Sequence, residues 1–380
     1  MKRNNFTGTA GWKPAVPVLN PPFFCRLEII FHPSSGRCAE TPQRSFFFKV
    51  NTKYNPALFW FAVLNAVATF LLIGLGGLVT SHEAGMSVPD WPTTYGYNMF
   101  VFPLDQWIGG IFYEHSHRLL ASGVGLLTTI LAVWLWAKDS RAWLHWLGIA
   151  AFLLVIVQGI LGGLRVRWSL DWLGVPHGAV GQTFLVLTCA IALFTSRWWQ
   201  NSETEKQISV PRGLRSHVLG LTILIFIQLL IAATMRHQHA GLAISDFPLA
   251  HGKIWPATSP EAVADYNAHR PPGYVGKPIT AFQVNLQMIH RLVAYLIFLG
   301  VAALPFLARK KLGGADWLAK FSWFWLALLS VQIALGAWTV LSNKAADVTT
   351  AHVMVGALAL LTGAVWWLVA ARRTASSADF

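Results

Sequence analysis

Eight long runs of apolar residues divide this 380-residue chain, and polar, charged or proline-rich segments separate them. A helix needs about 20 predominantly apolar residues to cross a bilayer, so runs of this length predict transmembrane helices. The predicted spans are residues 57–79, 112–136, 143–164, 177–198, 217–235, 282–307, 321–341 and 352–371. We therefore expect an all-α polytopic membrane protein with eight transmembrane helices.

Composition and charge agree with this class. Hydrophobic residues make up 54% of the chain and charged residues only 12%, far from the average of soluble domains. Lys and Arg gather before the first span and after the second, fourth, sixth and eighth, which predicts that both termini are cytoplasmic. Because the net charge of +13 is spread over these segments, it favours an anionic membrane surface over nucleic acid as a partner.

The chain also contains an internal repeat of four spans. The matched pairs are Ala84 with Ala240, Asp90 with Asp246, His117 with His290, Gln158 with Gln332, Gly162 with Gly336, His177 with His352 and Gly181 with Gly356. An even number of spans gives both copies the same orientation, so a pseudo-two-fold axis along the membrane normal should relate them. The expected architecture is two pseudo-symmetric four-helix bundles.

This repeat predicts the domain organisation of the chain. The predicted parts are a disordered cytoplasmic tail at 1–54, an N-terminal bundle at 55–199, a cytoplasmic linker at 200–215, a C-terminal bundle at 216–373 and a short tail at 374–380. The tail at 1–54 has no apolar run of spanning length, but its shortage of acidic residues also leaves a transit peptide open.

Four histidines stand at the start of four spans that run in the same direction: His117, His177, His290 and His352. An ionisable side chain within a span is costly, so its default interpretation is functional, although any one histidine can also be a hydrogen-bonded packing residue. Two histidines facing each other across a bundle suit the axial ligation of a haem iron. The sequence therefore predicts two haem pockets near the outer leaflet.

Residues beside these histidines extend the prediction. Gly181 and Gly356, one turn after two of the histidines, would let a flat ring approach the backbone. Arg118 and Arg291 directly follow the other two and are placed to pair with haem propionates, or to anchor their helices at the headgroups.

The repeat fails at one informative position. Glu114 lies one turn before His117, whereas the equivalent residue before His290 is Gln287. A buried carboxylate is costly unless it is partnered, so Glu114 is a candidate acid, base or charge stabiliser, with helix capping as the alternative. We therefore expect the N-terminal half to be the reaction site and the C-terminal half to hold a permanent cofactor.

Together these motifs resemble the haem A synthase family, which comprises bacterial enzymes and mitochondrial assembly relatives. The segments that carry the resemblance are 76–79, 86–92, 114–118, 177–182 and 290–291, within a similar stretch at 55–373. The resemblance implies an oxidoreductase that converts the C8 methyl group of haem O into the formyl group of haem A for cytochrome c oxidase assembly. It implies a bacterial inner membrane or, alternatively, a mitochondrial inner membrane.

The resemblance also implies residue roles and partners. His290 and His352 would be axial ligands of a resident haem b, His117 and His177 would hold the iron of the substrate haem O, and Glu114 would be catalytic. A haem O synthase would supply the substrate, and a quinol or a ferredoxin-type protein would be the electron donor. The sequence is compatible with a homo-oligomer.

This chain departs from the family pattern in two places. It lacks the cysteine pair that many bacterial members have in an outer loop, and residues 80–83 replace an arginine-rich stretch after the first span. Two other functions stay open, namely a dihaem electron carrier of the cytochrome b kind and a haem chaperone without enzymatic activity. Glu114 argues against both, because a carrier does not need it.

Overall fold

The computed structural model describes residues 54–201, 209–270 and 278–377. In this part of the chain, eight helices are long and apolar enough to cross a membrane, which confirms the eight predicted spans, and no β-strand occurs there. They are α1 (Pro56–Ser81), α2 (Gly109–Lys138), α3 (Ala142–Arg167), α4 (Gly174–Thr195), α6 (Arg212–His237), α8 (Ala281–Leu312), α9 (Trp317–Leu341) and α10 (Ala346–Ser377). The tail predicted at 1–54 lies outside the described residues apart from its last one.

Local signals in the sequence fix where several of these helices begin. Asn55 caps α1 directly before Pro56, a residue whose fixed φ suits the first helical position. Thr280 and Gln283 form a reciprocal capping box at the start of α8, and Asp316 caps α9. These caps satisfy backbone N–H groups that a helix start otherwise leaves without partners.

Short helices were not predicted from the sequence, because one to three helical turns carry too little periodicity to read. They are the 3₁₀ turns η1 (Met99–Val101), η2 (Leu104–Gln106), η3 (Asp171–Leu173) and η5 (Ala240–Leu242), and the α-helices α5 (Arg197–Gln200) and α7 (Pro260–Ala268). The fourth span ends at Thr195, before its predicted end at residue 198, because Ser196 caps the new helix α5. At the other end of the chain, α10 runs on to Ser377, into the stretch predicted as a tail.

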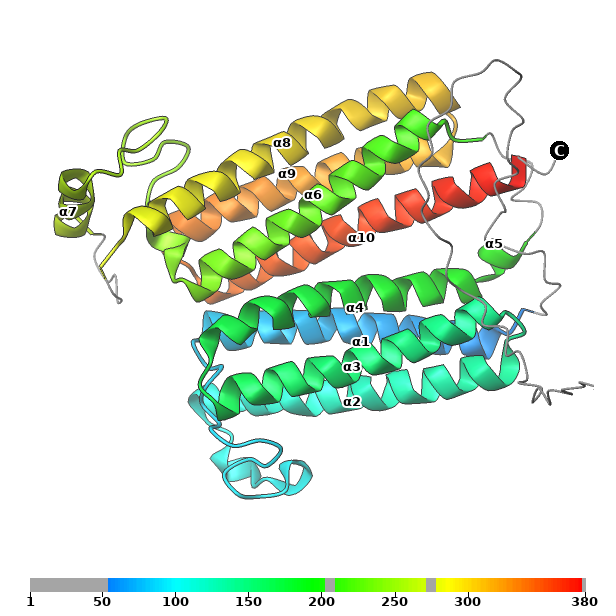
Figure 1. Ribbon diagram of the computed structural model, residues 1–380, viewed down its shortest axis with the longest axis horizontal. Helices are drawn as coiled ribbons and strands as arrows, with labels where there is room; N and C mark the ends of the chain where they lie inside the picture. Colours follow the sequence, from blue (N-terminus) through cyan, green and yellow to red (C-terminus); the bar gives the residue numbers. More distant parts are fainter. Residues whose placement is uncertain (1–53, 202–208, 271–277, 378–380) are drawn as a thin grey trace, which may run out of the picture. The chain divides into compact units, whose positions relative to one another are not determined.

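The long helices pack in two groups of four (Figure 1). Helices α1 to α4 enclose one apolar core, which includes Leu131, Leu144 and Ile191, and α6, α8, α9 and α10 enclose another, which includes Leu304 and Trp325. The groups meet where α1 packs on α10 and α4 packs on α6. This packing fits the predicted pair of four-helix bundles.

Both long loops lie at the same end of the helices, which we call the loop end (Figure 1). The first loop, 82–108, joins α1 to α2, and the second loop, 238–280, joins α6 to α8. Helices α2, α4, α8 and α10 all begin at the loop end, and each carries one of the four histidines within its first three turns. The matched sequence positions of the histidines thus become matched positions in space.

Buried arginines close the opposite end of each group. Arg373 on α10 donates to Asp316 at the start of α9 at 2.8 Å, and its side chain is only 1% exposed. Arg141 before α3 is held by Asp139 at 2.7 Å and donates to the main-chain oxygen of Phe194 at the end of α4 at 2.8 Å. Each arginine ties helix ends together that the apolar core alone would not position.

We expect Asp316→Asn to lower the stability of the protein by about 3 kcal/mol, because it leaves the buried Arg373 without a counter-charge. Because asparagine can still cap α9, the loss of stability measures the ion pair and not the helix cap. Thermal unfolding in detergent measures the change. Asp265→Asn is the control, since its pair with His269 is exposed (77% and 66%), and it should unfold like wild type. Equal melting temperatures for Asp316→Asn and wild type would show that the pair does not close the bundle.

Candidate functional site

The N-terminal half brings His117 on α2 and His177 on α4 together closely enough to interact electrostatically. Two glycines make room for the rings. A Cβ at Gly76 would lie 3.1 Å from Cε1 of His117, and one at Gly162 would lie 3.3 Å from Cε1 of His177. Each Nδ1 is buried without a hydrogen-bond partner among the described residues, whereas each Nε2 is unpaired but accessible. Both rings therefore present Nε2 as the atom that is open to a ligand.

The C-terminal half brings His290 on α8 and His352 on α10 together in the same way. Here the Nδ1 atoms have partners. Nδ1 of His352 lies 3.1 Å from the main-chain oxygen of Gln332, to which its N–H can donate, and Nδ1 of His290 lies 3.0 Å from the side-chain amide of Gln228. That amide also donates to the main-chain oxygen of His290 at 2.9 Å. The carbonyl partner on Nδ1 of His352 leaves the Nε2 lone pair of that ring for a metal, whereas the Gln228 amide donates to Nδ1 of His290 and fixes the orientation of that ring.

Gln228 was not singled out from the sequence, although the repeat contains the signal. Its counterpart on α1 is Leu72, so the N-terminal half has no amide to meet His117. A polar residue within an apolar span, present in only one copy of a repeat, needs a partner inside the protein. For Gln228 that partner is His290.

The glycines predicted to admit a flat ring lie against glutamine side chains. A Cβ at Gly181 would lie 3.0 Å from Nε2 of Gln158, and one at Gly356 would lie 3.1 Å from Nε2 of Gln332. These two glycines make room for the glutamines, and the approach of a flat ring to them stays a prediction. The glycines beside the histidine rings are Gly76, Gly162 and, against His352 in the C-terminal half, Gly336 at 3.0 Å.

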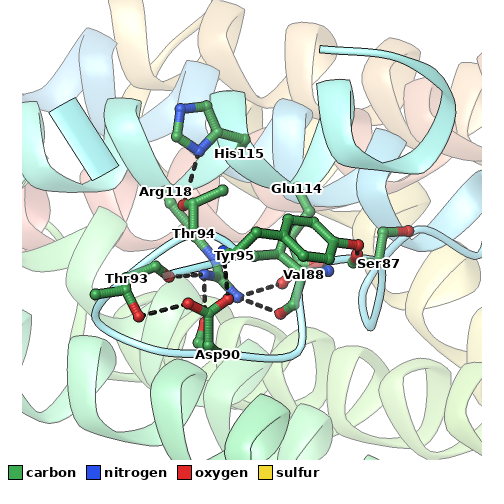
Figure 2. Close-up of polar contacts among 9 residues, drawn as sticks. All are labelled: Ser87, Val88, Asp90, Thr93, Thr94, Tyr95, Glu114, His115 and Arg118. Atoms are coloured by element: carbon green, nitrogen blue, oxygen red, sulfur yellow. Dashed lines mark hydrogen bonds and ion pairs between the residues drawn. The ribbon is translucent and has the colours of Figure 1, made fainter. Parts of the chain in front are cut away.

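Glu114 and Arg118 hold the first loop onto α2 (Figure 2). Oε2 of Glu114 accepts from the main-chain N–H of Val88 at 2.9 Å, and Oε1 accepts from Arg118 at 2.7 Å. Arg118 also donates to the main-chain oxygens of Val88, Asp90 and Thr93 at 2.7–3.0 Å. The buried Glu114 is thus partnered, and it shares its partners with the loop.

The second loop is held by the equivalent residues. Oε1 of Gln287 accepts from the main-chain N–H of Ile244 at 2.8 Å, and its Nε2 donates to the Ile244 oxygen at 3.1 Å. Arg291 donates to the main-chain oxygens of Asp246 and Leu249 at 2.8 and 2.9 Å. Because an amide does in one half what a carboxylate does in the other, loop attachment alone does not require the charge of Glu114.

An aspartate organises each loop from inside. Asp90 accepts from the main-chain N–H of Tyr95 at 2.7 Å and from the hydroxyl of Thr93 (Figure 2). It also accepts from the main-chain N–H of Gly96 at 2.9 Å. Burial raises the pKa of Asp90, but these hydrogen bonds outweigh it, so its pKa lies below the ordinary value. Asp246 accepts equivalent bonds in the second loop.

Arg118 and Arg291, the predicted partners of haem propionates, already donate hydrogen bonds to the two loops. Both terminal nitrogens of Arg118 are engaged by Glu114 and by loop oxygens, and those of Arg291 donate to two loop oxygens. The role visible for both arginines is loop attachment. Pairing with propionates stays a prediction that this arrangement does not favour, because it would compete with those bonds.

The histidine pairs fit a haem iron better than a bare ion. Within the described residues no group of three or more His, Cys, Asp or Glu side chains could hold a metal ion. Each pocket offers two imidazoles with accessible Nε2 atoms, which suits a metal that brings the remaining ligands in its own macrocycle. The bare glycine backbone beside three of the rings leaves a cradle that any Cβ would narrow.

We expect Glu114→Ala to destabilise the protein by about 2–3 kcal/mol, because the Val88 N–H and the Arg118 side chain lose a buried partner. Glu114→Gln should cost less than about 1 kcal/mol, since Gln287 shows that an amide can hold such a loop. Thermal unfolding in detergent compares the two variants, with Gln287→Ala as the matched control in the other half. Wild-type stability of Glu114→Ala would contradict the loop-attachment role.

Comparisons with known proteins agree on the family. The model of the cytochrome oxidase assembly protein family (COX15-CtaA) matches residues 59–365. A protein named Heme A synthase from an Exiguobacterium species is 26% identical over 78% of this chain and 87% of its own length. Another from Geobacillus kaustophilus is 27% identical over 78% and 86%, and one from Exiguobacterium sibiricum is 28% identical over 77% and 89%. This chain belongs to the cytochrome oxidase assembly protein family, which confirms the resemblance that its motifs indicated.

Proposed function

We propose that this protein is a haem A synthase, an oxidoreductase that converts the C8 methyl group of haem O into the formyl group of haem A. The N-terminal pocket, with His117 and His177, would bind haem O, and the C-terminal pocket, with His290 and His352, would hold haem b. The observation that carries this assignment is the difference between the pockets. In the part of the chain that the structure describes, the Nδ1 atoms are hydrogen-bonded in the C-terminal half and have no partner in the N-terminal half.

This difference in Nδ1 hydrogen bonding suits one pocket that keeps its haem and another pocket that releases its product. A hydrogen bond to the second ring nitrogen of a metal-binding histidine typically contributes about 10- to 100-fold in metal affinity. The Gln332 carbonyl offers this support to His352, and the Gln228 amide fixes the orientation of the His290 ring. The rings of His117 and His177 lack it, which suits a pocket that takes up a substrate and releases a product.

The chemistry requires an oxidant that no side chain supplies. Haem b, when bound, would provide electron transfer to or from the reacting half. Each of two successive oxidations replaces one hydrogen of the substrate methyl group by a hydroxyl group. If the oxygen comes from water, each step releases two electrons and two protons to an acceptor; if it comes from dioxygen, each step takes up two electrons and two protons and releases one water. The resulting geminal diol loses water to give the aldehyde. The protein must hold the substrate by its iron and handle the released protons near that carbon.

We assign the handling of protons near the methyl carbon to Glu114. It lies one turn before His117 on α2, buried, with its two oxygens fixed by Arg118 and the Val88 N–H. A carboxylate oxygen can accept more than one hydrogen bond, so each oxygen of Glu114 keeps acceptor capacity for a proton or a water. It would stabilise positive charge at the methyl carbon or accept a proton from attacking water.

Placement in the membrane completes the proposal. The distribution of Lys and Arg supports cytoplasmic termini, with the loop end and both pockets toward the outer leaflet of a bacterial inner membrane. Residues 55–199 would form the substrate bundle and 216–373 the haem b bundle, joined by a cytoplasmic linker. A haem O synthase would deliver the substrate, and a quinol or ferredoxin-type donor would complete the electron chain.

Co-expression with a haem O synthase in cells that lack haem A tests the function, with extracted haems separated by chromatography. Wild type should yield haem A. Glu114→Gln should fold and retain haem b but reduce conversion at least about 100-fold, because it removes the acid–base group. The matched control is Glu83→Gln, which neutralises an exposed carboxylate in the first loop and should act like wild type.

Two outcomes would contradict different parts of the proposal. Folded wild-type protein that binds haem but yields neither haem A nor its hydroxylated precursor would indicate an electron carrier or a chaperone. Normal conversion by Glu114→Gln would remove Glu114 from the chemistry and leave it with loop attachment alone.

A further inference from the structure

Three basic side chains gather where the two halves meet at the loop end. Arg165 stands in the last turn of α3, and Arg236 and His237 end α6. The three interact electrostatically with one another. The acidic side chain among them is Asp171, which is 62% exposed and lies 3.4 Å from Arg165. The cluster therefore carries more positive than negative charge in a partly buried place.

Arg165 lies beside the N-terminal histidine pair. It follows Gly162 by one helical turn, and Gly162 is the residue whose Cβ would touch His177. A Cβ at Gly85 in the first loop would lie 3.0 Å from Nη1 of Arg165, so the loop covers the guanidinium closely. Arg165 interacts electrostatically with both His117 and His177. Its Nε is buried and has no hydrogen-bond partner within the described residues.

Arg236 lies beside the C-terminal pair. Its Nη2 donates to the main-chain oxygen of Gly77 at 2.9 Å and to the hydroxyl of Ser81 at 2.8 Å, which fixes the guanidinium against α1. The Ser81 hydroxyl in turn lies 3.2 Å from that of Thr350, which is two residues before His352 on α10. In the described part of the chain, Nε and Nη1 of Arg236 have no partner and are accessible, and the side chain interacts electrostatically with His352.

His237 joins the cluster beside the first residue of α4. Its ring packs directly against Gly174, where any Cβ would overlap the imidazole. It interacts electrostatically with Arg165 and also with His177. Arg165 and His237 thus flank the N-terminal pocket, whereas Arg236 flanks the C-terminal one.

The repeat shows that the scaffold does not require these side chains. The counterpart of Arg165 on α9 is Thr339, and the counterparts of Arg236 and His237 on α1 are Thr80 and Ser81. Each basic residue therefore occurs in one half only, yet α3 and α6 place them together. Like charges repel most strongly where water is scarce, so such a cluster is expected to receive an anionic group from elsewhere.

We propose that Arg165, with His237, binds a carboxylate side chain of the tetrapyrrole in the N-terminal pocket, and that Arg236 binds a carboxylate of the tetrapyrrole in the C-terminal pocket. This inference rests on the proposed function only in taking both occupants to be tetrapyrroles. Guanidinium N–H groups form strong charge-assisted hydrogen bonds to carboxylates, and among the described residues Nε of Arg165 and both Nε and Nη1 of Arg236 have no partner. The carboxylates of both tetrapyrroles would then lie between the two halves of the protein, away from Arg118 and Arg291.

Titration with a diacid and its diester tests the inference without turnover. Full-length protein from haem-starved cells is titrated in detergent with ferric protoporphyrin IX or with its dimethyl ester, and the Soret band is followed at both sites. Wild type should bind the diacid more tightly than the diester at each site. Arg165→Gln should weaken diacid binding about tenfold or more at one site and leave diester binding unchanged.

Further variants assign the sites and control for charge. Arg236→Gln should remove the diacid preference at the other site, and Arg165→Lys should keep part of it, because the charge remains without the guanidinium N–H groups. Arg167→Gln is the matched control, since Arg167 is exposed on the same helix end. Without any tetrapyrrole, Arg165→Gln should unfold at or above the wild-type temperature, because it relieves repulsion within the cluster.

The outcomes separate this inference from the proposed reaction. Equal binding of diacid and diester by wild type, equal weakening of both by Arg165→Gln, or a destabilised apoprotein would each overturn the carboxylate role. Diacid preference that depends on Arg165 in a protein that makes no haem A would keep the inference and reject the reaction. Normal haem A production, together with no effect of Arg165→Gln on diacid binding, would keep the proposed reaction and reject the carboxylate role of Arg165.

Discussion

The rest of this structure depends on four imidazole rings that lie inside apolar helices. A ring in such a place needs room, and its two nitrogens need partners, because an unsatisfied polar group away from water is costly. The helices provide the room through glycines at three of the four rings. Among the described residues, they provide a partner for Nδ1 only at His290 and His352, and they leave Nε2 open at all four rings. A metal held by paired Nε2 atoms is the occupant that this chemistry favours.

Duplication explains why the two halves look alike, and a few substitutions explain why they differ. In both halves an arginine and a residue one turn before the histidine hold the preceding loop, so the scaffold is shared. The differences are the pairs Leu72 and Gln228, Glu114 and Gln287, Thr80 and Arg236, and Arg165 and Thr339. All four pairs lie beside the histidine pockets or between them. Divergence at these positions would turn one repeated pocket into a substrate site and a cofactor site.

Much of the fold could be predicted from the sequence, because long apolar runs and a repeated motif are properties of the chain itself. The eight spans and the matched depth of the histidines follow from that pattern. The site was predicted less completely. Gln228 and Arg236 act through contacts between helices that are distant in sequence, and only the folded arrangement shows what they meet. Arg118 was expected to face a ligand, but the preceding loop folds back and engages its terminal nitrogens.

The central claim is that the two pockets hold their occupants with unequal strength. Capture of haem by excess apomyoglobin, from protein loaded at both sites, measures this most directly. We expect two phases, with a slow phase that accelerates about tenfold or more in Gln228→Leu and a fast phase that this variant leaves unchanged. A single phase for wild type, or acceleration of the fast phase by Gln228→Leu, would contradict the division into substrate and cofactor pockets.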